Sequence, residues 1–126
     1  MFATLLQVAL GGAAGASARY LTGVAVLRAF GLGVMPLGVL IANILGSFLM
    51  GCLVVFLGQR GLSHLNPLLL TGLLGGYTTF SAFSMEAWTL FERGQAGTAL
   101  LYVVLSVGLS LAGLAIGVLA MRAVLA

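Results

Sequence analysis

The feature that most constrains this chain is the length of its uncharged segments. No Asp, Glu, Lys or Arg occurs within residues 29–59, 61–85 or 94–121. Each segment is longer than the roughly 20 residues that an α-helix needs to cross the hydrocarbon core of a bilayer. Charged residues make up 6% of the chain, against about 25% in a typical soluble domain. These two properties indicate an integral membrane protein.

Hydropathy and the connections rich in Gly and Pro predict four membrane-spanning helices. We expect them at residues 3–27, 37–57, 67–91 and 98–124. Four crossings of about 20 residues each leave only short connections in a chain of 126 residues. The expected fold is therefore a single all-α transmembrane domain of four helices that occupies residues 1–126.

The arginines show almost no bias between the two sides of the predicted helices. With four spans, Arg60 and Arg122 face one compartment, whereas Arg28 and Arg93 face the other. Arg19 falls inside the first span, toward the end that bears Arg28. Because the positive-inside rule needs an excess of positive charge on one side, the chain has no preferred orientation. Two opposite orientations of one chain predict an antiparallel, dual-topology homodimer, unless one span is misplaced.

The sequence lacks the residue sets of the common hydrolytic enzymes. It has one Cys (Cys52), one His (His64), no Asp and no Lys. Metal hydrolysis, nucleophilic triads and paired-acid chemistry lack their parts, so we do not expect an enzyme. The net charge of +3 is spread thinly, which excludes the basic patch of a nucleic-acid partner. Cys52 lies in an apolar stretch and is expected to be a small buried residue.

Uncharged polar residues recur at helical spacing in two of the predicted spans. The stripes are Asn43, Ser47 and Gly51 in the second span and Tyr102, Ser106 and Ser110 in the fourth. Spacing of four residues places each set along one face of a helix. Polar groups inside a membrane must find partners or line a water-filled path. The two stripes therefore predict either hydrogen-bonded helix contacts or a pore lining whose hydroxyls donate to an anion.

The third predicted span contains the most unusual local sequence. The glycine pair 75–76 is followed closely by Thr78 and Thr79, and this composition disfavours a helix interior. We expect the helix to break here, near the bilayer centre, where free carbonyls attract cations and free N–H groups attract anions. Phe80 and Phe83 share a helical face beside Thr79 and Ser81. Their ring edges carry partial positive charge that suits an anion, although ordinary packing is the commoner reason for such a pair in a membrane helix.

Three segments of the sequence resemble the CrcB/Fluc family of fluoride channels. They are residues 11–20, residues 40–48 and, most specifically, the stretch 75–84 that reads GGYTTFSAFS. Length and span layout agree, so the resemblance covers essentially the whole chain. It implies a dual-topology antiparallel homodimer in the cell inner membrane, with two fluoride pathways and a central structural sodium ion. It also implies passive export of fluoride that relieves fluoride toxicity.

The resemblance also assigns roles to particular residues. Sodium would bind the backbone carbonyls of Gly75 and Thr78 from both subunits, and Arg19 and Glu86 would lie near a pore mouth. Tyr77 and Ala82 occupy motif positions that vary in the family. The fluoride pathway would comprise Asn43, Thr79, Phe80, Ser81, Phe83, Tyr102, Ser106 and Ser110.

Two other functions fit a short four-span chain. A small dual-topology multidrug or cation transporter would need an acidic residue in the first span, which has none. Glu86 and Arg93 lie on roughly the same helical face. Glu86 is therefore expected either to form an interfacial ion pair with Arg93 or to place its charge at a pore mouth. A non-transporting scaffold would need only helix packing at small residues such as Gly11 and Gly15.

Overall fold

The computed structural model describes residues 1–126, and every regular element in it is helical. The four long helices are α1 (Phe2–Phe30), α2 (Leu37–Gln59), α4 (Phe80–Glu92) and α5 (Ala96–Leu125). Before α4 come the 3-10 turn η1 (Ser63–Leu65), the π-helix η2 (Pro67–Leu74) and the short α3 (Gly75–Tyr77). The predicted all-α class is confirmed, and the span limits agree with the predictions to within about three residues.

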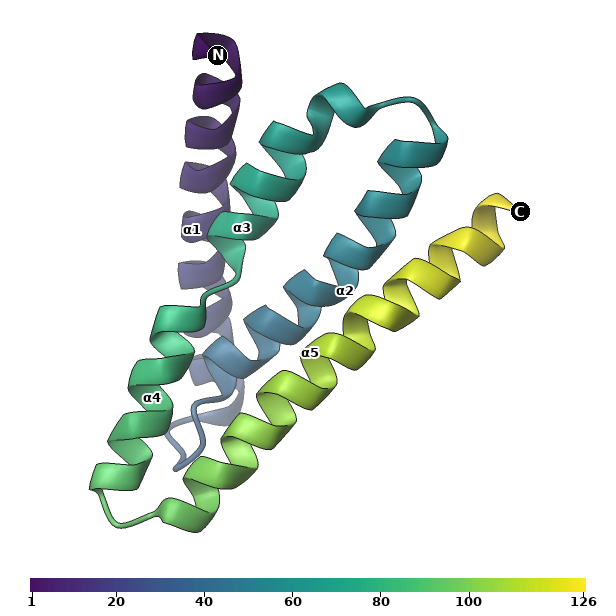
Figure 1. Cartoon of the computed structure of the whole chain (residues 1–126). Coiled ribbons are helices and arrows are strands. Elements are labelled where there is room, and N and C mark those ends of the chain that lie inside the picture. Colours follow the sequence, from purple (N-terminus) through teal and green to yellow (C-terminus); the bar gives the residue numbers. More distant parts are fainter.

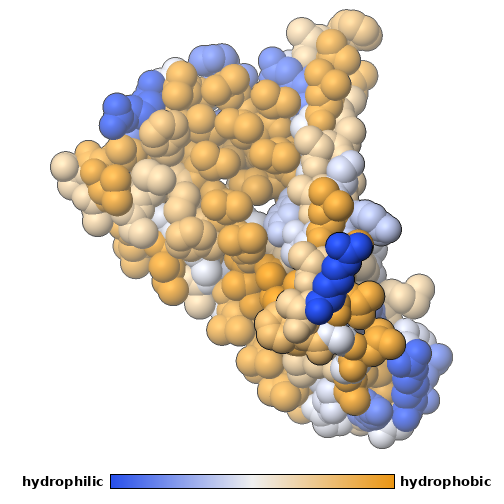
Figure 2. Space-filling view, turned by 180° about the vertical axis from the view of Figure 1, so that it is seen from behind, coloured by the Kyte–Doolittle hydropathy of each residue, from blue (hydrophilic) through white to orange (hydrophobic).

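Three helical segments are long and apolar enough to cross a membrane. They are Leu37–Gln59, Ser63–Glu92 and Ala96–Leu125. The helix α1 has 29 residues but is less apolar, because Gln7, Arg19 and several Gly residues lower its hydropathy. Three of the four predicted spans are therefore helices with the length and composition that a membrane crossing needs, and the crossing by α1 stays a prediction. Figure 2 shows that apolar residues cover most of one face of the molecule.

The helices form two closely packed pairs. Figure 1 shows α2 and α5 side by side, and it shows the segment formed by η2 and α3 lying across α1. Both termini and the connection from α2 to η1 lie toward one end, whereas the α1–α2 and α4–α5 connections lie at the other (Figure 1). This arrangement places Arg28 and Arg93 at the same end, as the predicted spans require.

Glycines allow the backbones of each pair to approach closely. A Cβ atom at Gly11 would overlap the Leu68 carbonyl of η2, and one at Gly15 would overlap the Leu73 carbonyl. The α2–α5 crossing also has a glycine at its close backbone contact, since a Cβ at Gly117 would overlap the Phe48 carbonyl. The predicted packing through small residues is thus confirmed in both pairs.

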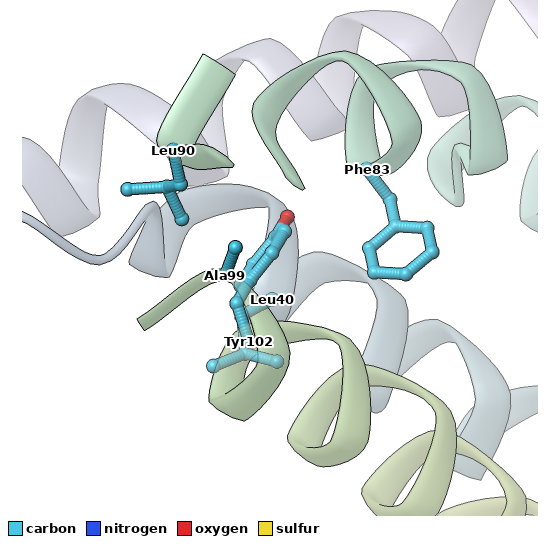
Figure 3. Close-up of a cluster of buried hydrophobic side chains, with 5 residues drawn as sticks. All are labelled: Leu40, Phe83, Leu90, Ala99 and Tyr102. Carbon is cyan, nitrogen blue, oxygen red and sulfur yellow. The ribbon is translucent and has the colours of Figure 1, made fainter. Parts of the chain in front are cut away.

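A small apolar core joins α2, α4 and α5. It contains Leu40, Phe83, Leu90, Ala99 and Tyr102, and Figure 3 shows these side chains gathered between the three helices. Tyr102 has no exposed surface. Because close-packed side chains have few alternative rotamers, this core fixes the orientation of Phe83 at the start of α4.

The third predicted span is not a continuous helix in the structure. Gly75 and Gly76 are helical in α3, whereas Thr78 (φ −88°, ψ 156°) and Thr79 (φ −150°, ψ 121°) are extended. The interruption therefore falls at the threonines and not at the glycine pair. β-Branched residues fit extended backbone better than glycine does. Its position at the bilayer centre stays a prediction.

Candidate functional site

A pocket of about 370 Å³ opens between α2, α5 and the extended segment that precedes α4. The polar residues of its lining are Asn43, Ser47, Thr78, Thr79, Ser106 and Ser110. The rest of the lining is apolar, apart from Gly46. The two predicted polar stripes and the third span thus meet at one place, although residues 43–47, 78–83 and 106–110 are well separated in the sequence.

Asn43 holds the extended segment in place through two hydrogen bonds to one residue. The Thr79 N–H donates to Asn43 Oδ1 (2.7 Å), and Asn43 Nδ2 donates to the Thr79 carbonyl (2.9 Å). A carboxamide has two N–H groups, so one of them remains for another acceptor at the pocket. Sequence reasoning missed this pairing. The only signal was that a buried amide in an apolar helix requires a partner.

Thr79 also starts α4. Its Oγ1 accepts a hydrogen bond from the Ala82 N–H (3.2 Å) and lies 3.3 Å from the Ser81 hydroxyl oxygen. Thr79 therefore acts as the N-cap of α4, whose first turn carries the partial positive charge of the helix dipole beside the pocket. Ser81 is exposed and does not line the pocket.

Three aromatic rings form a row from the pocket into the core. Phe80 and Phe83 make an edge-on contact with centroids 5.4 Å apart at 63°, and Phe83 lies 5.4 Å from Tyr102. Phe83 is buried, whereas 76% of Phe80 is exposed in the single chain. The predicted aromatic pair therefore lies at the pocket, with one ring fixed by the core and one uncovered.

Only part of the polar stripe predicted on α5 lines the pocket. Ser106 and Ser110 line it, whereas Tyr102 lies deeper and donates a hydrogen bond from its hydroxyl to Glu86 Oε2 (2.8 Å). The Ser106 Oγ is buried and has no hydrogen-bond partner in the chain. Buried hydroxyls normally have partners, so this one is available to an occupant of the pocket.

The expected ion pair between Glu86 and Arg93 is wrong. The Glu86 carboxylate is engaged by Tyr102 of α5, while Arg93 follows the end of α4. Arg19 likewise contacts backbone: its Nε donates to the Gly76 carbonyl at 3.2 Å. The pore-mouth positions of Glu86 and Arg19 stay predictions.

The interruption leaves carbonyl oxygens without their helical donors. In a continuous helix the Thr79 N–H would bond to the Gly75 carbonyl, but it is diverted to Asn43. Both the N–H and the hydroxyl of Thr78 donate to the Leu74 carbonyl. Uncommitted carbonyls are the oxygen ligands that hard cations prefer. Gly75 and Thr78 thus fit a sodium ion chemically, although two carbonyls do not complete its coordination shell.

No cluster of three or more His, Cys, Asp or Glu side chains that could hold a metal ion occurs in the chain. Together, the apolar helices and the polar pocket between them define an all-helical membrane protein whose candidate site consists of hydroxyls, amides and ring edges. Residues 6–118 match the family model described as CrcB-like protein, Camphor Resistance (CrcB). The chain belongs to this family, and the resemblance seen in the sequence is confirmed.

Several relatives match the chain over nearly its whole length. A protein of Ruegeria sp. (strain TM1040) is 62% identical over 125 residues, which is 99% of each chain. One from Cereibacter sphaeroides is 62% identical over 122 residues, or 97% of each. A third, from Rhizobium leguminosarum bv. trifolii, is 46% identical over 94% of this chain and 95% of its own. All three are named fluoride-specific ion channel FluC.

Proposed function

We propose that this chain forms a fluoride-selective passive channel that exports fluoride down its electrochemical gradient and so relieves fluoride toxicity. The observation that carries this proposal is the convergence of Asn43, Ser106, Ser110 and the Phe80–Phe83 pair on one pocket. That convergence occurs in a chain 62% identical to a protein named as a fluoride-specific channel. Together they favour a channel over a multidrug or cation transporter or a scaffold.

Fluoride is small and strongly hydrated, so a pathway must replace its water with other donors. The free Asn43 N–H, the unpaired Ser106 hydroxyl and the Ser110 hydroxyl are such donors, and the Phe80 and Phe83 edges add weaker positive potential. Thr79 and Ser81 at the start of α4 and Tyr102 at the deep end extend this pathway. Several moderate sites allow an ion to enter and leave quickly.

The proposed assembly is an antiparallel, dual-topology homodimer of chains with four spans, α1 included. Two observations support it: the arginines are balanced between the two ends, and Phe80 is largely exposed beside the polar pocket. An anion path open to lipid along its side would be costly, so a second copy covering this face is favoured. Carbonyls of Gly75 and Thr78 from both copies would then bind one structural sodium ion.

The function follows from acid chemistry and needs no fuel. Hydrogen fluoride crosses membranes, dissociates in a more alkaline cytoplasm and leaves fluoride trapped inside. In the cell inner membrane, the membrane potential drives anions outward through an open path. The proposed role of the chain is to supply that path and to exclude larger anions, because its narrow, pre-organised contacts fit only a small ion.

The proposal is tested by fluoride efflux from proteoliposomes that contain the purified chain, measured with a fluoride electrode. Potassium and valinomycin set the membrane potential, and chloride efflux from identical vesicles is the control. We expect rapid fluoride release and chloride release no faster than from protein-free vesicles. Equal release of both anions would contradict selectivity, and no release of either would contradict the proposed function.

A further inference from the structure

Two neighbouring residues of α3 are tied to one face of α1, just before the extended threonines. The Gly76 carbonyl accepts a hydrogen bond from Arg19 Nε (3.2 Å), and the Tyr77 hydroxyl lies 2.8 Å from Thr22 Oγ1. Arg19 and Thr22 are three residues apart, so they share a face of α1. The segment is therefore anchored to α1 on its N-terminal side and to α2, through Asn43, on its C-terminal side.

The direction of the Tyr77 hydrogen bond follows from counting protons. The Thr22 hydroxyl donates to the Ala18 carbonyl (3.0 Å), and a hydroxyl has only one proton to donate. Tyr77 must therefore donate to Thr22 Oγ1. The result is a relay of two hydrogen bonds from the start of the extended segment to the backbone of α1, and such chains strengthen each other.

The Tyr77 ring is held as firmly as its hydroxyl. Only 7% of the residue is exposed, and a Cβ atom at Gly46 would lie 3.2 Å from Tyr77 Cδ2. The ring thus packs between Thr22 of α1 and Gly46 of α2. Tyr77 lies midway between the two proposed carbonyl ligands, because the Gly75 and Thr78 carbonyls belong to the next peptide groups beyond the two that flank it. A fixed ring therefore restricts the backbone segment that joins these two carbonyls.

We propose that Tyr77 and Thr22 are positioning residues that set the direction of the Gly75 and Thr78 carbonyls and thereby the affinity of the interruption for its cation. The identity of that cation, sodium, rests on the proposed function. Tyr77 does not touch the ion or the fluoride pathway. It acts by pre-organisation: ligands held in place before binding lose less freedom when the ion arrives.

The test is a sodium titration of thermal unfolding, using the purified full chain in detergent. Sodium chloride replaces choline chloride at constant ionic strength, and the midpoint of the stabilisation reports sodium affinity. The variants Tyr77→Phe and Thr22→Val each remove one hydroxyl and keep the side-chain shape. We expect each to raise the sodium midpoint about two- to tenfold, the usual range for one lost hydrogen bond.

The double variant and two further substitutions sharpen the result. Tyr77→Phe and Thr22→Val break the same hydrogen bond. The double variant should therefore bind sodium no more weakly than either single variant. Thr22→Ser keeps a hydroxyl and should recover most of the sodium affinity lost in Thr22→Val. Ser17→Ala removes an exposed hydroxyl of α1 that bonds only to Ala13, and should leave the midpoint unchanged.

Several outcomes would overturn the proposal. One is a lower unfolding temperature in Tyr77→Phe and Thr22→Val with an unchanged sodium midpoint, since this is the behaviour of a purely structural bond. Another is an unfolding temperature of the wild-type chain that is no higher in sodium chloride than in choline chloride. If one single variant fails to fold, the other breaks the same bond and decides the matter. Fluoride efflux is measured separately, so its absence would overturn the proposed function and leave the sodium result standing.

Discussion

The Asn43 side chain forms hydrogen bonds with the backbone and also lines the pocket. Its amide fixes Thr79 through two hydrogen bonds and leaves one N–H free for an anion. Asp at this position has no N–H for the Thr79 carbonyl, and its negative charge repels both that oxygen and fluoride. Ser is too short for both bonds but retains one donor. We expect fluoride efflux at least about fivefold lower for Asn43→Asp than for Asn43→Ser, given charge repulsion of about 1 to 4 kcal/mol at 4 Å.

This comparison is measured with proteoliposomes, after size-exclusion chromatography has shown that both variants are folded. Equal efflux from Asn43→Asp and Asn43→Ser would mean that the side chain acts only on the backbone of Thr79. The amide would then have no part in the pathway.

The two phenylalanines differ in how much the fold depends on them. Phe83 is packed against Tyr102, whereas Phe80 is largely exposed. Replacing Phe80 by Ile keeps apolar volume and removes the ring edges, so we expect an intact fold and a loss of most fluoride efflux. Phe83→Ile should give the same loss of efflux and, in addition, a destabilisation of about 1 to 3 kcal/mol from imperfect repacking.

The measurement is efflux together with the thermal unfolding temperature of each variant. Phe91→Ile is the matched control, because Phe91 is also exposed on α4 but does not line the pocket. Efflux at the wild-type rate from both Phe80→Ile and Phe83→Ile would exclude a role for the ring edges.

At the scale of helices, sequence reasoning worked where local composition decides the outcome. Uncharged runs and Gly- or Pro-containing connections located the helices, and four-residue spacing identified stripes that do meet in one pocket. It could not find the pairing of Asn43 with Thr79, because this pairing joins two segments that are distant in the sequence. It also gave no sign of the π-helix η2. It located the interruption in the stretch that contains the glycine pair 75–76 and the two threonines. Within that stretch, the extended residues are Thr78 and Thr79, where Asn43 holds the Thr79 backbone.

The α2–α5 crossing is a second prediction at this scale. A Cβ at Gly51 would overlap the Leu114 carbonyl of α5, whereas a Cβ at Gly58, on the same helix, would meet nothing within 4 Å. Backbone cannot move aside as a flexible side chain can, so Gly51→Ala should destabilise the chain by about 1 to 3 kcal/mol. Gly58→Ala should be neutral or slightly stabilising. Equal unfolding temperatures of the two variants in detergent would show that this close contact does not limit stability.

For the whole molecule, the arrangement of charges bears on how each copy is oriented in the membrane. Arg28 and Arg93 lie at the end of the fold that holds the α1–α2 and α4–α5 connections, and Arg60 and Arg122 lie toward the other (Figure 1). Neither end has an excess that would direct insertion. Small changes in this balance should therefore choose the orientation of every copy without altering any pocket residue.

Three lysines added after Ala126 should direct all copies into one orientation, because that side would then carry five positive residues against two or three. If an antiparallel pair is required, this variant alone should not protect a fluoride-sensitive host. Co-expression with a copy that has extra lysines in the connection of residues 31–36 should supply the opposite orientation and restore growth in fluoride. An antiparallel pair brings the two interruptions face to face, where carbonyls from both copies reach one cation. Full resistance from the C-terminally extended copy alone, once protease protection has established a single orientation, would rule out this assembly.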